Sequence, residues 1–335
     1  WLIRLVKLVT KCPGVLGLPR PFSSIFNNKQ PPLKMPKPTR NFILITLFFV
    51  GLYAFVRSLP TQSCELAYYG DYLNPDGSLG FCGDEEVHFF DLDQLQYPFN
   101  VQLQQDVTLS AGTKQSLRMQ FTGPDGQPVR PEDLIVSHAE RLHLLAVSED
   151  LSDYQHLHPQ ATGVPGEYCF DWQPLRAGDY RLYFDFIVQA SLRRALVDTQ
   201  VKVAGLPQSA PPARPRAVNL QAQTEQYAFE LQADRAEFRA NETVYFDLVV
   251  THRQTGTQVE LQEVMGALAH LVAFDPQRNG FAHMHPLQPY LPERAQPDRI
   301  PFAFNAIVAG HYRIWAQVQI DGQPVFVPFD LSILT

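Results

Sequence analysis

Six of the ten histidines occupy matching positions in two copies of one motif. In each copy, a histidine in an apolar run is followed 13 positions later by a His-x-His-Pro segment. The six residues are His143, His156, His158, His270, His283 and His285. Five positions before the first histidine stands His138 in one copy and Met265 in the other. A constellation of side chains that is repeated in register predicts shared chemistry.

Imidazole is the usual protein ligand for copper(II), zinc and nickel. Side chains two positions apart on a strand point to the same face, so the two histidines of each His-x-His segment should project together. Apolar runs at 142–147 and 268–274, each followed by a polar link, predict hairpins. Symmetric turns would set His143 opposite His156 and His270 opposite His283. Each hairpin would then gather three imidazoles at one end of one face.

The fourth position suggests which ion is bound. Met265 or His138 could each complete the site of its own copy. Three histidines and a methionine favour copper, whereas four histidines discriminate less, and zinc is the less favoured ion. No cysteine stands at the repeated positions, so a blue-copper centre has no support. The alternative stays open that the imidazoles are structural and bond backbone carbonyls at the hairpin ends.

A larger repeat surrounds the histidines. Ala-Gly-x-Tyr-Arg occurs at 177–181 and again at 309–313, and alternating apolar residues precede and follow it. Short alternating segments with turn signals between them predict an all-β chain of two tandem immunoglobulin-like antiparallel β-sandwich domains, at 97–204 and 225–335. A Pro-rich linker at 205–224 joins them. The Ala-Gly-x-Tyr pattern resembles the tyrosine corner of immunoglobulin-like folds.

The N-terminal part is a different kind of sequence. Residues 1–40 hold eight basic residues and no acidic one, while all 34 acidic residues lie beyond Arg57. The uncharged run 41–56 predicts a single membrane-spanning helix at 41–59, with a cleaved signal peptide and a buried core helix as alternatives. The basic excess places 1–40 in the cytoplasm, as an arm with an interfacial helix and a Pro-rich connector. The expected location is therefore a bacterial inner membrane, with the bulk of the chain periplasmic and with lipid as a partner.

The remaining expectations concern the cysteines and nucleic acid. A disulfide between Cys64 and Cys82 would pin a neck at 60–96, while Cys12 and Cys169 are expected to be unpaired. The acidic outer part argues against nucleic acid as a partner.

The paired His-x-His-Pro hairpins with Ala-Gly-x-Tyr-Arg resemble bacterial membrane-anchored or secreted immunoglobulin-like proteins associated with heavy-metal handling. That resemblance covers most of 97–204 and 225–335, and it implies a periplasmic metal-binding role for the six repeated histidines. An alternative is a non-catalytic accessory subunit that stabilises a larger respiratory or photosynthetic membrane complex through contacts with other membrane-protein subunits. We do not expect an enzyme, because no acid, base or nucleophile is repeated or clustered.

Overall fold

A computed structural model describes residues 37–58, 89–92, 97–104, 108–205, 217–287 and 297–335. The chain divides into two units, Trp1–Gln62 and Ser63–Thr335. The predicted Cys64–Cys82 disulfide and Cys12 lie outside the described residues. Cys169 is a free, half-buried cysteine.

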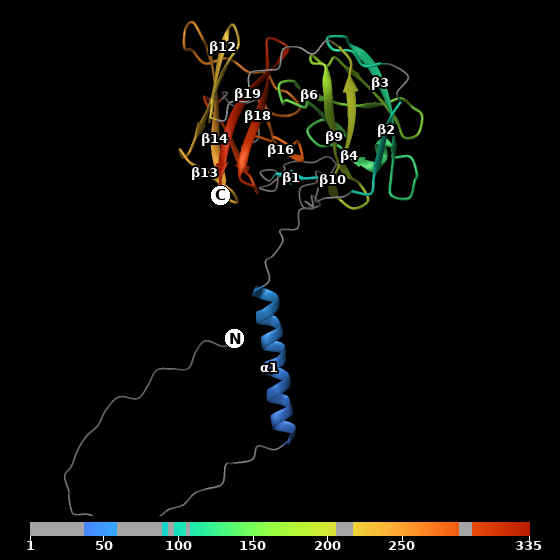
Figure 1. Ribbon diagram of the computed structural model, residues 1–335, viewed down its shortest axis with the longest axis vertical. Helices are drawn as coiled ribbons and strands as arrows, with labels where there is room; N and C mark the ends of the chain where they lie inside the picture. The colour runs from blue at the N-terminus through green and yellow to red at the C-terminus, as the bar shows by residue number, and fades with distance from the viewer. Residues whose placement is uncertain (1–36, 59–88, 93–96, 105–107, 206–216, 288–296) are drawn as a thin grey trace, which may run out of the picture. The chain divides into compact units, whose positions relative to one another are not determined.

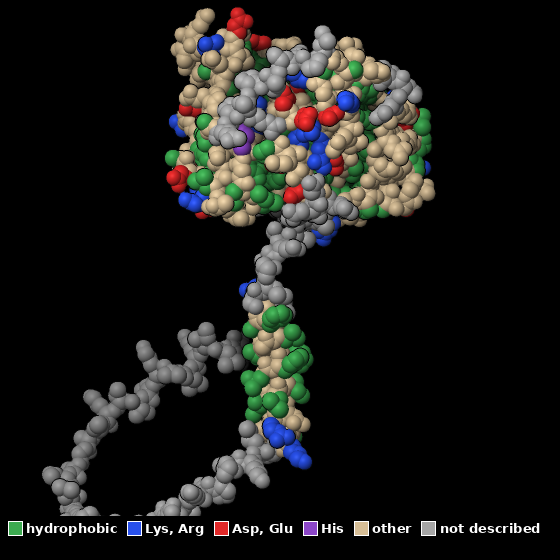
Figure 2. Space-filling view, viewed as in Figure 1, with side chains coloured by type: hydrophobic (Ala, Val, Ile, Leu, Met, Phe, Trp, Pro, Cys, Tyr) green, Lys and Arg blue, Asp and Glu red, His purple; other side chains and the backbone are tan. Residues whose placement is uncertain are grey.

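The first unit contains one described helix, α1 (Lys37–Ser58). It is long and apolar enough, over Lys37–Phe55, to cross a membrane by length and composition. Its hydrophobic side chains are exposed, with Phe42 at 71%, and Figure 2 shows them covering the helix. The Thr46 hydroxyl in its apolar run is satisfied locally, because Thr46 Oγ1 donates to the Phe42 carbonyl at 2.9 Å. The helix therefore fits a membrane anchor.

The second unit is built from antiparallel sheets, as the alternating sequence predicted. The first sandwich pairs sheet β10-β9-β5-β6, with β4 beside β9, against sheet β2-β3-β8-β7. Its strands are β2 (Asn100–Leu103), β3 (Gln115–Thr122), β4 (Leu134–Ile135), β5 (His143–Ser148), β6 (Tyr154–Leu157), β7 (Gln160–Ala161), β8 (Glu167–Trp172), β9 (Gly178–Val188) and β10 (Arg193–Val203), with a short 3-10 helix at Pro131–Asp133. The core between the sheets takes alternate residues of each strand, among them Met119 and Phe184.

The second sandwich repeats this plan. Sheet β1-β16-β15-β18-β19-β13 packs against sheet β11-β12-β14-β17. The strands are β1 (Phe90–Asp91), β11 (Gln221–Gln223), β12 (Tyr227–Ala233), β13 (Phe238–Arg239), β14 (Thr243–His252), β15 (Ala269–Phe274), β16 (Gly280–Met284), β17 (Ile300–Asn305), β18 (Gly310–Ile320) and β19 (Gln323–Leu334). All but β13, which runs parallel to β19, pair in antiparallel fashion. Tandem all-β sandwiches are therefore the fold of this unit.

The tyrosines of the two repeats reach to nearby groups at the sandwich edge. Tyr312 Oη donates to the Val308 carbonyl at 2.9 Å, four residues upstream. Tyr180 Oη donates to Asp153 Oδ2 at 2.5 Å and accepts from the Arg176 amide at 3.1 Å. The second tyrosine thus makes the backbone bond of a tyrosine corner, and the first binds a carboxylate.

Strand β1 belongs to the second sandwich although it precedes the first in sequence. It pairs with β16, Phe90 opposite Phe281 and Asp91 opposite Gly280. The approach is so close that a Cβ at Gly280 would overlap the Phe90 carbonyl oxygen. A segment expected to belong to the neck therefore completes a sheet of the second sandwich (Figure 1).

The two sandwiches pack on each other through a third apolar cluster. Leu145, Val147 and Tyr183 from the first domain meet Val272 and Trp315 from the second. Alternate residues of β5 and β15 face inward instead, so both faces of these strands are covered. Every residue of β5 and of β15 is buried as a result. Figure 1 shows β6 and β16 between the outer strands of the two domains.

Candidate metal centre

The first histidine trio forms at the end of the β5–β6 hairpin. His143 opens β5, His156 lies on β6, and His158 follows one residue after that strand ends. One ligand nitrogen from each lies within 4.8 Å of the others. The predicted pairing of His143 with His156 is wrong, because His156 lies opposite Leu145.

The physical reason is the turn. Leu151 adopts a left-handed φ of 60°, and its amide bonds the Ser148 carbonyl at 3.0 Å. The amide of Ser148 then bonds the Asp153 carbonyl at 2.9 Å and closes the loop. This moves the centre of the turn one residue later, so partners shift by two positions. A shift of two keeps every side chain on its face, and the trio therefore still forms.

The second trio repeats the arrangement on β15 and β16. His270 lies on β15, His283 on β16 and His285 just after it, with ligand nitrogens again within 4.8 Å of one another. The predicted pairing of His270 with His283 is wrong, because His283 lies opposite Val272. Arg278 supplies the left-handed turn residue, with a φ of 58°.

The two trios meet in the interface between the sandwiches. The ring centroids of His156 and His283 are 5.0 Å apart, and those of His143 and His283 are 5.8 Å apart. A small cavity of about 10 Å³ lies beside them, lined by His138, His143 and Asp185 of the first domain and by His283 and His285 of the second. That is roughly the room needed by one water or one ion. We call these seven side chains, His138 and the two trios, the histidine cluster.

His138 and Met265 hold equivalent positions in two tight turns. Both have left-handed backbones, with φ of 49° and 52°, and each turn is closed by a bridge, Ser137 to Glu140 and Val264 to Ala267. The His138 ring stacks on His285 of the other domain, with centroids 3.5 Å apart and an interplanar angle of 7°. It therefore lies beside the trio of the second domain and not only beside its own. Met265 is half-buried, and its part in the centre stays a prediction.

Each sandwich contributes one polar side chain that contacts a histidine of the other sandwich. His156 Nδ1 lies 3.1 Å from Gln317 Oε1 on β18. His283 Nδ1 lies 3.5 Å from Asp185 Oδ2 on β9, and Arg194 Nε donates to that carboxylate at 2.8 Å. Burial by itself would raise the pKa of Asp185, but the charge and hydrogen bonds of Arg194 outweigh burial and hold it well below its usual range. Asp185 is thus an anion.

Several ring nitrogens of the cluster make no hydrogen bond with a described residue. His270 is 1% exposed, and neither its Nδ1 nor its Nε2 has a hydrogen-bond partner; the same holds for His158 Nε2. A buried polar group without a partner costs about 1–3 kcal/mol. The structural alternative, in which the imidazoles bond backbone carbonyls, fits His143 Nε2, which lies 3.0 Å from the Ser137 carbonyl, but it does not fit His270.

Four histidines of the cluster are neutral at ordinary pH. Burial, reinforced by neighbouring imidazoles, holds the pKa of His143, His156 and His270 well below 6.5. Burial and then His283 lower the pKa of His158 to about 4. Only the neutral imidazole can bind a metal, so these four imidazoles are in their ligand form.

The two described histidines outside the repeat, His252 and His311, lie elsewhere. His311 Nε2 lies 3.1 Å from Asp330 Oδ1, and exposed His252 packs on the Tyr227 ring. Sequence reasoning missed Asp185 and Gln317, which stand at the same place after the two repeated tyrosines, five positions on. A polar residue recurring inside two apolar strands is the signal that could have found them.

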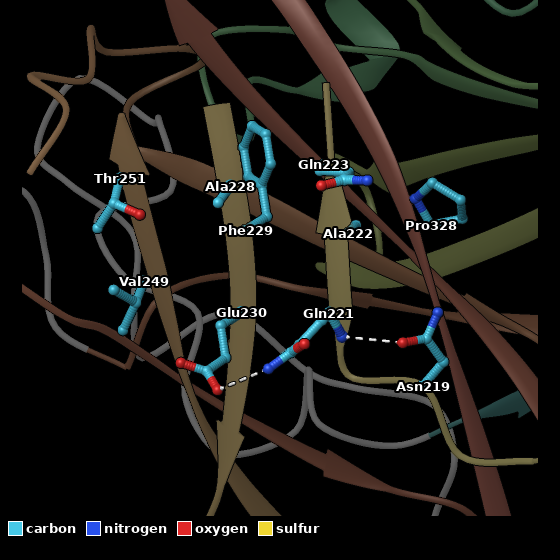
Figure 3. Close-up of a pocket in the computed structure, with 10 residues that line it drawn as sticks. All are labelled: Asn219, Gln221, Ala222, Gln223, Ala228, Phe229, Glu230, Val249, Thr251 and Pro328. Atoms are coloured by element: carbon cyan, nitrogen blue, oxygen red, sulfur yellow. Dashed lines mark hydrogen bonds between the residues drawn. The ribbon is translucent and has the colours of Figure 1, made fainter. Parts of the chain in front are cut away.

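A separate groove on the second domain has a different character. Figure 3 shows Gln221 of β11 between Asn219 and Glu230. The Gln221 amide bonds Asn219 Oδ1 at 3.2 Å, and its side-chain nitrogen bonds Glu230 Oε1 at 3.4 Å. No histidine or cysteine is among the ten residues that line this groove. Among the described residues, the groups that could hold a metal ion are the two histidine trios, not this groove.

Comparison with known proteins gives a family without a function. The family model described as "Domain of unknown function (DUF8832)" matches residues 95–203 and again 222–334. No curated protein matches the chain.

Solved structures that resemble the chain are distant. The fibronectin(III)-like modules of Clostridium thermocellum CbhA are 13% identical, with 70% of this chain and 94% of that one covered and a TM-score of 0.19. The mouse nectin-like molecule 4 ectodomain (Ig1-Ig3) is 12% identical, with 71% and 64% covered and a TM-score of 0.18. The Lin-41 filamin domain is 12% identical, with 33% and 88% covered and a TM-score of 0.19.

Proposed function

Because the chain belongs to the family described as Domain of unknown function (DUF8832), which assigns no activity, we propose a function from the site itself. The protein binds a transition-metal ion, with copper favoured, through the histidine cluster. It holds this cluster on a membrane anchor formed by α1. The observation that carries the proposal is the pair of trios, each with two buried and one half-buried histidine and with three ligand nitrogens within 4.8 Å of one another.

The ligand types support copper over the alternatives. The two trios are made of imidazoles alone, and hard ions such as magnesium and calcium prefer oxygen ligands. Among divalent ions bound by nitrogen, copper(II) binds more tightly than zinc or nickel. The trio imidazoles whose pKa is lowered are already neutral near neutral pH, so protons do not compete with the ion for their nitrogens.

We also propose that the anchored domains lie on the outer side of a bacterial inner membrane. The support is the charge distribution: basic residues precede α1, and every acidic residue follows it. We propose that the anchored domains bind and hold the ion without catalysis, because no acid, base or nucleophile is repeated or clustered in the sequence. Protease added to intact spheroplasts should then trim the sandwiches, and their protection would contradict the topology.

The metal test uses the detergent-solubilised full chain, stripped with a chelator and titrated with copper(II) or zinc(II) against a chromophoric competitor. Wild-type protein should bind copper more tightly than zinc. Replacing both His283 and His285 by Ala should weaken binding at least tenfold, whereas exposed His252→Ala should leave it unchanged. Wild-type protein that binds neither ion would overturn the proposal and favour the accessory-subunit interpretation, which co-purification of partner subunits would then test.

A further inference from the structure

The metal centre is built so that each sandwich orients a ligand of the other. Asp185 on β9 faces His283 of the second domain, and Gln317 on β18 faces His156 of the first. The two polar residues stand at equivalent places in the repeat, each five positions after the repeated tyrosine. Each contacts the first histidine of the opposite His-x-His-Pro segment, and each does so at Nδ1. Two matching contacts that cross the interface in opposite directions are a built feature.

These contacts decide which ring nitrogen carries the proton. Asp185 forms a buried ion pair with Arg194 and presents a carboxylate oxygen to His283, so the Nδ1 of His283 that faces it carries the hydrogen. Gln317 presents its carbonyl oxygen in the same way to His156. In both rings Nε2 is then left with its lone pair, the form that binds a metal. Metal-ligating histidines characteristically donate their other N–H to a carboxylate or carbonyl in this manner.

A proton count across the first trio leads to the same conclusion. The Ser137 carbonyl, 3.0 Å from His143 Nε2, takes the one hydrogen of that neutral ring. His143 Nδ1 is then a lone pair, and it lies 3.2 Å from His156 Nε2, which is a second lone pair. No proton lies between the two. Two nitrogens bound to one tetrahedral ion at about 2.0–2.1 Å stand about 3.3 Å apart, which is close to this spacing.

We propose that the metal site belongs to the docked pair of sandwiches, with Gln317 and Asp185 as positioning residues that act across the interface. This rests on the proposed metal-binding function and deepens it. Neither domain alone holds the first histidine of its His-x-His-Pro segment in the binding form. Metal binding and docking of the two sandwiches are therefore linked. If docking raises the affinity for the metal by some factor, bound metal raises the docking equilibrium constant by the same factor.

The test compares variants of the detergent-solubilised full chain for copper(II) affinity, using a chromophoric competitor, and for thermal stability without metal. Gln317→Met keeps the size of the side chain and removes the acceptor, so copper affinity should fall about 10- to 100-fold. The matched control is Gln319→Met, two residues along the same strand. Gln317→Glu should restore the affinity, because a carboxylate accepts from Nδ1 as Asp185 does.

The outcomes separate the two claims. Wild-type protein without copper affinity defeats the proposed function itself. Wild-type affinity in Gln317→Met, or lost affinity in Gln317→Glu, overturns the cross-domain role while metal binding stands. The latter result would mean that Gln317 donates to His156 through its amide nitrogen. Asp185→Asn is the second arm: copper affinity should drop because an amide no longer fixes the tautomer of His283, and an unchanged value counts against the proposal.

Discussion

His270 provides a test in which stability and binding should move in opposite directions. The side chain is 1% exposed, and both ring nitrogens lack hydrogen bonds among the described residues. Leucine has a comparable volume and no polar atom. His270→Leu should therefore stabilise the metal-free protein by roughly 1–3 kcal/mol, the usual cost of a buried unsatisfied polar group. When the two sandwiches unfold together as one docked unit, each 1 kcal/mol raises Tm by about 2–4 °C.

With metal the order should reverse. An ion present at 100 times its Kd stabilises the native state by about 2.7 kcal/mol, and the variant, which lacks one trio ligand, should lose most of that gain. The assay is thermal unfolding of both proteins with chelator and with excess copper(II), followed by circular dichroism. The matched control is His252→Leu, at an exposed site outside the histidine cluster, which should leave the response to metal unchanged.

A metal-free His270→Leu protein that unfolds at a lower temperature than wild type would refute this reasoning. That result would mean that the imidazole makes stabilising contacts of its own. The histidine cluster would then be structural.

Histidine protonation, the buried ion pair and the interface between the sandwiches can each be tested as well. Burial lowers the pKa of His158 from 6.5 to about 4 in the folded state, and the pKa values of the neighbouring histidines are lowered too. The stability of the metal-free protein should therefore be full above pH 6.5 and should fall as the pH drops toward 4. Urea midpoints that stay constant over that pH range would contradict this prediction. Arg194→Gln should cost about 3–5 kcal/mol, because it leaves the buried Asp185 anion unpaired, and denaturant unfolding measures this. Val272→Asp should separate the sandwiches and weaken copper binding without unfolding either domain, because Val272 lies in the apolar cluster between them. Hydrogen exchange should then become faster only in the interface strands. Faster exchange throughout both cores would argue against this prediction.

The fold class and the trios could be predicted because they depend on local patterns. Strand alternation has a period of two, so the buried rows through Met119 and Phe184 can be recognised in the sequence. The histidine trios survived an error in the hairpin register because the error was an even number of residues. The turn itself could not be located, since Leu151 and Arg278 are not residues that usually mark a left-handed position.

The meeting of the two trios was beyond local patterns. His156 and His283 come together across a separation of more than a hundred residues, and spacing within either repeat carries no information about it. A usable signal was nonetheless present. The runs 142–147 and 268–274 are nearly continuous in apolar residues, which indicates strands covered on both faces rather than one. The second cover is the other sandwich.

Strand β1 sets an order of events during folding. The ribosome releases Phe90 and Asp91 long before their partners on β16, and the first sandwich is synthesised in between. The first sandwich can form from contacts within its own segment, whereas the sheet that carries His283 is finished only when β1 docks on its edge. Pairings this distant in sequence form slowly, because the loop that separates them must close first. Until then β16 is an open strand edge, the kind of surface that recruits other chains. We therefore expect completion of the histidine-bearing sheet to be a late folding step, with the open edge of β16 prone to aggregation until then.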